Sequence, residues 1–465
     1  MSIDFGKGKW TKVDWAKNLT TIGIPLILFL IPCSGIYDMQ MKLFFVSTVM
    51  AVLCFAFENV PQATVAITLP LFWIFFGVAP ADTVFAPWTQ YIPWYVLGGV
   101  VMAVVLEDTG LLKRIAFFCI EKVGCTYNRI LIGIAITGFF CAIFIGDVSL
   151  PIAALCYGLC KSLGLHRCKE AAGIMMVGAI SALVPGMMTF QAPIMSMAFA
   201  IDVTGPLELL GFFESLYMNL PLLLWYILCV AAAMLMFKPS RPINGKEYFR
   251  EELRAMGKLS LAEKKAAAIL IFYLVFLISQ GFGGVLSLEW GMAFIPVLTI
   301  APVIGAGGKE QVAKIQYDFV LFVTACMAIG TVAVYLGIGD LLVDAVMPIL
   351  EGTSHQVFFL AAWLICVISN FVMTPIGIYA AFSMPLATVA QALGIDPMAV
   401  FYLMEASTDQ IIFPYEHGLY MFFFAFGIVR MKDFMKMMGT KMVLHFVITF
   451  LLLIPWWNVN HFIFA

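Results

Sequence analysis

Long apolar segments, separated by short polar ones, make up most of this 465-residue chain. Those that read as simple membrane-crossing helices cover residues 19–33, 42–57, 62–79, 92–107, 208–237, 266–281, 289–305, 317–337 and 442–464. An amphipathic segment at 111–124 is too short and too mixed to cross a bilayer, so we expect it at the membrane interface. One long polar linker, residues 238–265, divides the chain near its midpoint.

Gly, Pro or polar residues interrupt apolar segments at four further places, 146–151, 184–191, 369–377 and 413–418. We interpret the first and third as the tips of re-entrant helical hairpins, and the second and fourth as breaks in discontinuous transmembrane helices. Unwound backbone at membrane depth persists only where it is buried in protein or lines a cavity. The pattern therefore predicts an all-α polytopic membrane protein with 11 transmembrane helices plus two re-entrant helical hairpins.

Composition and charge agree with this class. Hydrophobic residues make up 63% of the chain and charged residues only 12%, against about 25% charged residues in soluble domains. With a cytoplasmic N-terminus and an outside C-terminus, every Lys and Arg except Lys42 falls on the cytoplasmic side of the cell (inner) membrane, as the positive-inside rule requires. This topology places no Lys or Arg within the membrane core. Without a basic, aromatic-rich cluster or a nucleophile–base constellation, the sequence favours neither nucleic-acid binding nor an enzyme.

The two halves of the chain share features at a nearly constant separation. Leu163-Gly164 recurs as Leu393-Gly394, and Pro185 recurs as Pro414. Because the first hairpin must enter from the cytoplasm and the second from outside, these repeats would be inverted. Inverted repeats with broken helices that meet near the midplane are typical of secondary transporters. The sequence contains no P-loop motif, which argues against ATP as the energy source.

The four breaks supply the candidate binding residues. Freed carbonyls, hydroxyls, amides and carboxylates suit a hard cation such as Na⁺, and helix N-termini attract an anion. For the anionic substrate we select Asp147, Val148, Ser149, Gln191, Asn370, Thr374, Pro375, Gly377 and His417. For the cations we select Gly146, Asp147, Ser149, Pro185, Thr189, Ser369, Asn370, Thr374, Glu405, Asp409, Pro414 and Glu416.

Structural alternatives exist for these residues. The hydroxyl groups could bond only to helix carbonyls. Glu405 and Asp409 lie on one helix face, and at membrane depth they must pair, be protonated, bind a cation or face water. Glu416 and His417 could be ion ligands or a proton relay.

Residues 94–99 and 106–116, together with 430–434 before the last span, carry a family resemblance. They resemble the fourth span, the interfacial helix and the pre-terminal segment of the divalent anion/sodium symporter (DASS) family, in the ion transporter superfamily. The resemblance implies an elevator-type homodimer in membrane lipid that carries dicarboxylates, tricarboxylates or sulfate with Na⁺. It implies scaffold segments at 1–127 and 207–353, a moving unit at 128–206 and 354–430, and a final helix at 431–465.

The chain departs from the family at its expected site. The family's Ser-Asn-Thr at each hairpin tip is replaced by Gly146-Asp147-Val148-Ser149 and by either Ser369-Asn370-Phe371 or Pro375-Ile376-Gly377. The family's Thr-Pro-Pro in the broken spans is replaced by Gln191-Ala192-Pro193 and His417-Gly418-Leu419.

The leading hypothesis is Na⁺-coupled symport of a dianion, with bound cations offsetting the substrate's charge. The main alternative is cation exchange of Na⁺ against H⁺ on the same fold, which the acidic residues at the breaks favour. A channel or a non-transporting receptor is an alternative from a different class.

Overall fold

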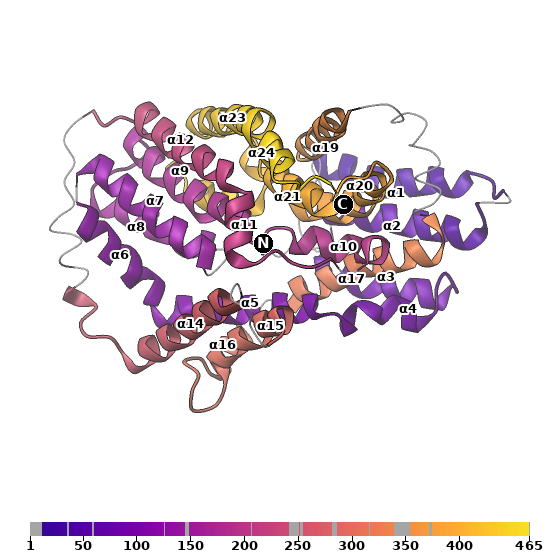
Figure 1. Ribbon diagram of the computed structural model, residues 1–465, viewed down its shortest axis with the longest axis horizontal. Helices are drawn as coiled ribbons and strands as arrows, with labels where there is room; N and C mark the ends of the chain where they lie inside the picture. Colours follow the sequence, from indigo (N-terminus) through magenta and orange to yellow (C-terminus); the bar gives the residue numbers. More distant parts are fainter. Residues whose placement is uncertain are drawn as a thin grey trace.

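The computed structural model describes residues 12–34, 37–57, 60–124, 126–144, 148–205, 207–240, 251, 254–280, 286–315, 317–338, 354–371 and 374–464 (Figure 1). Every regular element within these ranges is a helix, apart from one isolated antiparallel bridge between Ile395 and Phe464. The predicted all-α class is confirmed. Parts of the polar linker and residues 339–353 lie outside the described ranges.

Two sets of helices, one from each half of the chain, pack against each other. The first set is α1 (Lys12–Leu30), α2 (Met39–Phe57), α3 (Gln62–Phe75), α4 (Ala81–Phe85), η1 (Ala86–Thr89), α5 (Tyr91–Thr109) and α6 (Leu111–Val123). The second is α14 (Leu261–Gln280), α15 (Leu288–Val297), η3 (Leu298–Ile300), α16 (Lys309–Ala313) and α17 (Tyr317–Tyr335). Helix α5 packs on α15, and α3 packs on α17. Each long helix thus contacts a shorter helix of the other set, as two intertwined repeats would require.

The predicted hairpins and broken helices of the two halves also pack against each other. The first half contains α7 (Tyr127–Phe144), α8 (Ser149–Ser162), α9 (Lys169–Leu183), η2 (Val184–Met188) and α10 (Ile194–Thr204). The second contains α19 (His355–Ser369), α20 (Pro375–Ala392), α21 (Pro397–Thr408), η4 (Pro414–Glu416) and α22 (Gly418–Ala425). Helices α7 and α8 pack on α9, and α19 and α20 pack on α21. In addition, α8 contacts α22 and α20 contacts α10, so each hairpin touches the broken helix of both halves.

One sequence match between the halves has an identical backbone role. Gly164 and Gly394 end α8 and α20 with φ of 65° and 69°, in the left-handed region that favours glycine. The following amides, of Leu165 and Ile395, donate back to the carbonyls of Cys160 and Ala390 at 2.8 and 2.9 Å. The same C-terminal motif therefore closes the second helix of both hairpins.

The span predicted at 208–237 is bent. It forms α11 (Phe212–Met218) and α12 (Leu220–Met236), which meet at 66°. The reason is Pro221, which has no N–H for the carbonyl of Tyr217. The freed carbonyls of Tyr217 and Met218 accept instead from the indole N–H groups of Trp456 and Trp457, at 3.0 and 2.9 Å.

The last span begins eleven residues earlier than the expected 442–464, since its first helix, α23 (Met431–Ile448), starts at Met431. It continues through the π-helical η5 (Thr449–Leu453) into α24 (Ile454–Val459). Within the described ranges, five stretches are long and apolar enough to cross a membrane: α5, α7, α9 with η2, α17, and this last stretch. The bent pair α11–α12 would be a sixth. The total of eleven crossings stays a prediction.

A buried ion pair joins α6 to α14. The Arg114 guanidinium donates to both oxygens of Glu263, at 2.7 and 3.2 Å, and to the carbonyls of Met256 and Gly257. The Glu263 carboxylate also accepts from the amide of Ser260 at 2.7 Å. The hydrogen bond from Arg114 holds the pKa of the Glu263 carboxyl below its usual value.

We expect Arg114→Met to lower the free energy of unfolding by about 2 kcal/mol, because it leaves the Glu263 carboxylate and two carbonyls without their donor. The matched control is Lys314→Met, since the ammonium of Lys314 pairs with Asp108 at 2.6 Å on the surface and such pairs contribute about 0–1 kcal/mol. Denaturant unfolding of both variants in detergent checks this prediction. Equal destabilisation of the two variants would contradict it.

Candidate functional site

The break in the second half separates α21 from α22. Helix α21 ends at Thr408 with Asp409 as its C-cap, and the chain then runs through η4 to the start of α22 at Gly418. The Glu416 carboxylate accepts from the freed amides of Ile412 and Phe413 at 3.0 and 3.1 Å. These bonds satisfy backbone groups that the break leaves unpaired, and they give Glu416 a structural role in this conformation.

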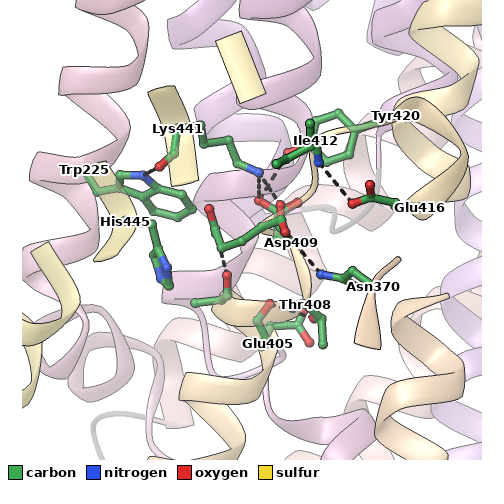
Figure 2. A network of polar contacts seen from close by, with 12 residues as sticks. Trp225, Asn370, Glu405, Thr408, Asp409, Ile412, Glu416, Tyr420, Lys441 and His445 are labelled. Carbon is green, nitrogen blue, oxygen red and sulfur yellow. Dashed lines mark hydrogen bonds and ion pairs between the residues drawn. The ribbon is translucent and has the colours of Figure 1, made fainter. Parts of the chain in front are cut away.

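A buried lysine pairs with Asp409 at this break. Figure 2 shows the Lys441 side chain extending from α23 toward the Asp409 carboxylate, with Nζ 2.5 Å from Oδ2. The Lys441 ammonium also donates to the backbone carbonyl of Asp409, and the Tyr420 hydroxyl donates to Oδ2 at 3.2 Å. Both charged side chains are only 1% exposed. The expectation that no Lys or Arg lies among the membrane helices is therefore wrong.

Aromatic rings enclose this ammonium. It lies 4.9 Å from the ring centroid of Tyr420 and 5.8 Å from that of Trp225, distances at which a cation is attracted to the π face. The Trp225 indole donates to the carbonyl of Lys441 at 3.1 Å, which ties α12 to α23.

His445 lies one turn beyond Lys441 and is neutral in this arrangement. Its Nδ1 accepts from the indole N–H of Trp363 at 3.1 Å, so the ring proton is on Nε2, 3.1 Å from the Thr449 hydroxyl. With His445 neutral, the ammonium of Lys441 is the positive charge that faces the Asp409 carboxylate.

Three buried oxygen atoms at this break accept no hydrogen bond from the described part of the protein. They are Oδ1 of Asn370, Oδ1 of Asp409 and Oε1 of Gln410. The Asn370 amide donates to the carbonyl of Gln410 at 3.3 Å, which connects the second hairpin tip to the break (Figure 2). Buried acceptors without donors are costly, and such oxygens are the ligands that a hard cation prefers.

Other predicted residues of the second half cap helices here. Thr374 is the N-cap of α20 and accepts from the amide of Gly377 at 3.5 Å, with Pro375 as the first helical residue. His417 is the N-cap of α22, and its Nδ1 accepts from the amide of Leu419 at 3.3 Å. Ser369 is the last residue of α19, and Pro414 opens η4. Glu405 is half-buried on α21, one turn from Asp409.

The break in the first half lies at 189–193, after η2. Pro185 is inside η2, which continues α9 as a 3-10 turn, so the extended backbone begins at Thr189. The buried Thr189 hydroxyl donates to the carbonyl of Gly186 at 2.7 Å. Gln191 lies 3.4 Å from the Tyr273 hydroxyl of α14. Val148 and Ser149 open α8 and are both buried, whereas Gly146 and Asp147 lie outside the described residues.

The two breaks belong to helices that contact each other. Helix α21 packs on η2 and on α10, so the ends of both broken helices share one buried region. Among the described residues, no group of three His, Cys, Asp or Glu side chains is arranged to hold a metal ion.

Sequence reasoning missed Lys441, Tyr420, Trp225 and Gln410. A signal for Lys441 was present: Phe434, Met437, Met438 and Lys441 recur at helical spacing, and the structure buries all four on one face of α23. The lysine occupies a core position of α23, in the part of this helix that lies before the span predicted from the sequence.

A model of one protein family, described as the sodium:sulfate symporter transmembrane region, matches residues 12–463. Among solved structures, the chain is similar to the YdaH transporter of Alcanivorax borkumensis, with 13% identity, a TM-score of 0.58, and coverage of 96% of this chain and 98% of that one. It is also similar to MtrF of Neisseria gonorrhoeae, described within a class of antimetabolite efflux pumps, with 12% identity, a TM-score of 0.56, and coverage of 93% and 97%. At such identities these likenesses show the fold alone. No curated protein matches the chain significantly.

Proposed function

Because the chain belongs to the sodium:sulfate symporter family, we propose that it is a Na⁺-coupled symporter of a dicarboxylate, a tricarboxylate or a sulfate-like anion. This match confirms the family resemblance that was predicted from the sequence. Members of the family are multi-pass membrane transporters rather than enzymes. The substrate, the coupling ion and the mechanism are the proposal.

The observation that carries the proposal is the mutual packing of hairpins and broken helices. Helix α8 contacts α22, α20 contacts α10, and the two broken helices touch each other. Four helix interruptions therefore belong to one packed unit, which is the arrangement that secondary transporters use to hold ions and substrate near the midplane. A channel would not need paired interruptions, so this packing favours a carrier.

Within this unit, the proposed cation ligands lie at each hairpin tip and its neighbouring break. In the first half they include Ser149 and Thr189 with the carbonyls around Pro185. In the second half, Asn370 at the tip of α19 already bonds to the break at Gln410. Cations held there would offset the negative charge of a dianion between the two sites, where the N-termini of α8 and α20 would also attract it.

We propose an elevator mechanism in which residues 128–206 and 354–430 move together across the scaffold segments 1–127 and 207–353. The packing of each hairpin on both broken helices supports this division, because such a unit could move without losing its internal contacts. A homodimer in the inner membrane, with the N-terminus in the cytoplasm, stays the expected assembly and orientation.

Liposomes containing the purified protein should take up radiolabelled sulfate, succinate or citrate faster with an inward Na⁺ gradient than with an equal K⁺ gradient. The physical reason is that entry of the anion is coupled to cations moving down their gradient. Empty liposomes and an inward choline gradient are the controls. If none of the three anions enters faster with Na⁺, this substrate class is wrong.

Na⁺/H⁺ exchange is the competing function on the same fold. Its main support was the acidity of the breaks, and two of those carboxylates are engaged: Asp409 by Lys441, and Glu416 by backbone amides. Glu405 is the acidic group of α21 that still favours exchange. Na⁺-driven collapse of a pH gradient across the same liposomes, without any anion substrate, would select this alternative.

A further inference from the structure

We propose that the Lys441 ammonium is a tethered substitute for a coupling ion, so that the second break binds no Na⁺ while the lysine is present. This inference rests on the proposed function for the role of the site, but its test does not depend on transport. It changes the expected ion count of the carrier.

The position of the ammonium is where a coupling ion would be held. Asp409 is the C-cap of α21, and the C-terminal end of a half-helix presents unpaired carbonyls and the negative end of its dipole. Lys441 Nζ bonds to one of those carbonyls and to Oδ2 of the same residue. Its partners at the break are oxygen atoms, the ligand type that a hard cation takes from protein.

Removing the lysine would leave a complete set of oxygen ligands. Oδ2 and the backbone carbonyl of Asp409 would lose the ammonium. Close to them in the chain fold are Oδ1 of Asp409, Oδ1 of Asn370 and Oε1 of Gln410, which have no donor in the described structure. The aromatic rings of Tyr420 and Trp225, whose centroids lie 4.9 and 5.8 Å from the ammonium, would remain beside the vacated space. A cavity of the size of an ammonium group, lined by a carboxylate and carbonyl oxygens, suits Na⁺.

Among the described residues of the first half, the corresponding bridge contains no charged side chain. Ser181 follows the first residue of α9 by the same number of positions as Asp409 follows the first residue of α21. The Tyr226 hydroxyl of α12 donates to the Ser181 hydroxyl at 2.9 Å. At the corresponding place in the second half, Lys441 of α23 forms an ion pair with Asp409. The bridge between a broken helix and the following span is therefore neutral in one half and ionic in the other. Of these two bridges, the one in the second half contains a cation of the protein itself.

The test compares thermal unfolding in NaCl and in choline chloride at equal concentration. For Lys441→Ala and the bulkier Lys441→Met, we expect Na⁺ to raise Tm by about 4 °C more than it does in the wild type, because Na⁺ binds the freed oxygens of the folded state only. Lys436→Ala is the matched control, since Lys436 is exposed on the same helix. The double variant Lys441→Ala with Asp409→Asn should lose the added response.

Two outcomes would overturn the assignment. One is a Na⁺ response in the Lys441 variants no larger than in the wild type. The other is a wild-type Na⁺ response that Asp409→Asn abolishes, because Na⁺ would then bind at Asp409 alongside the lysine; this arm remains decisive if the Lys441 variants do not fold. An added Na⁺ response in the Lys441 variants, together with a wild type that takes up no anion, would instead retain this assignment and refute the proposed symport.

Discussion

Replacing Asp409 with asparagine is expected to lower the free energy of unfolding by about 3–5 kcal/mol. The substitution removes the carboxylate charge that lies 2.5 Å from the Lys441 ammonium, while both side chains are almost completely buried. The amide cannot compensate a buried cation, and no other carboxylate is bonded to this lysine among the described residues. Titration with a denaturing detergent, followed by tryptophan fluorescence, measures the loss.

The double variant Asp409→Asn with Lys441→Met provides the decisive comparison. Removing both charges leaves a neutral pair of similar volume, which is commonly no less stable than a buried ion pair. We therefore expect the double variant to recover all but about 1 kcal/mol of the wild-type stability. Asp433→Asn is the surface control, since Asp433 pairs with the half-exposed Arg430 within the first turn of α23. A double variant less stable than Asp409→Asn would show that the charges are not coupled.

Gly138→Ala should destabilise the protein by about 3 kcal/mol, at the upper end of overpacking effects. A Cβ atom at Gly138 would lie 2.5 Å from the Cβ atom of Ser181 and 2.7 Å from its carbonyl oxygen. Because the closest contacts include the backbone of α9, the hairpin helix α7 would have to move away from the broken helix. We expect loss of transport as well as stability, because α7 and α9 belong to the same proposed moving unit.

Gly158→Ala is the matched control for this substitution. Gly158 is on α8 of the same hairpin, and a Cβ atom there would meet no atom within 4 Å. Alanine in a helix interior is favoured over glycine by about 0.5–1 kcal/mol, so this variant should be neutral or slightly stabilised. Equal losses in the two variants would mean that the α7–α9 contact has no special importance. Melting temperature and uptake activity together distinguish the outcomes.

The helix breaks could be predicted because their causes are local. Pro185 and Pro414 lie at the first turns of the 3-10 helices η2 and η4, which interrupt the α-helices next to each break, because proline has no amide N–H for the preceding turn. The bend at Asn219 was missed although Pro221 marks it, because apolar residues on both sides maintain the appearance of a continuous span. Its freed carbonyls are satisfied by Trp456 and Trp457, more than two hundred residues away, and a local pattern cannot reveal such partners.

The role of Lys441 was missed for a different reason. The positive-inside rule assigns a lysine near a span to the cytoplasm, because an unpaired ammonium in the membrane is costly. That cost disappears when a carboxylate, a carbonyl and two aromatic rings surround the ammonium, and only the folded structure brings Asp409, Tyr420 and Trp225 to it. Asp409 was selected from the sequence as a sodium ligand, and this role stays a prediction; the structure places the residue at the C-cap of α21, next to the break.

The unlike bridges at Ser181 and Asp409 have a consequence for directionality. If the two halves had the same internal bonds, the empty carrier would have similar free energies when open toward either side of the membrane. Here the bridge is ionic in one half and a hydrogen bond between two hydroxyls in the other, so under the proposed mechanism the inward-open and outward-open forms would differ in energy. Under that mechanism, the empty carrier would favour one side of the membrane even without an ion gradient across the bilayer.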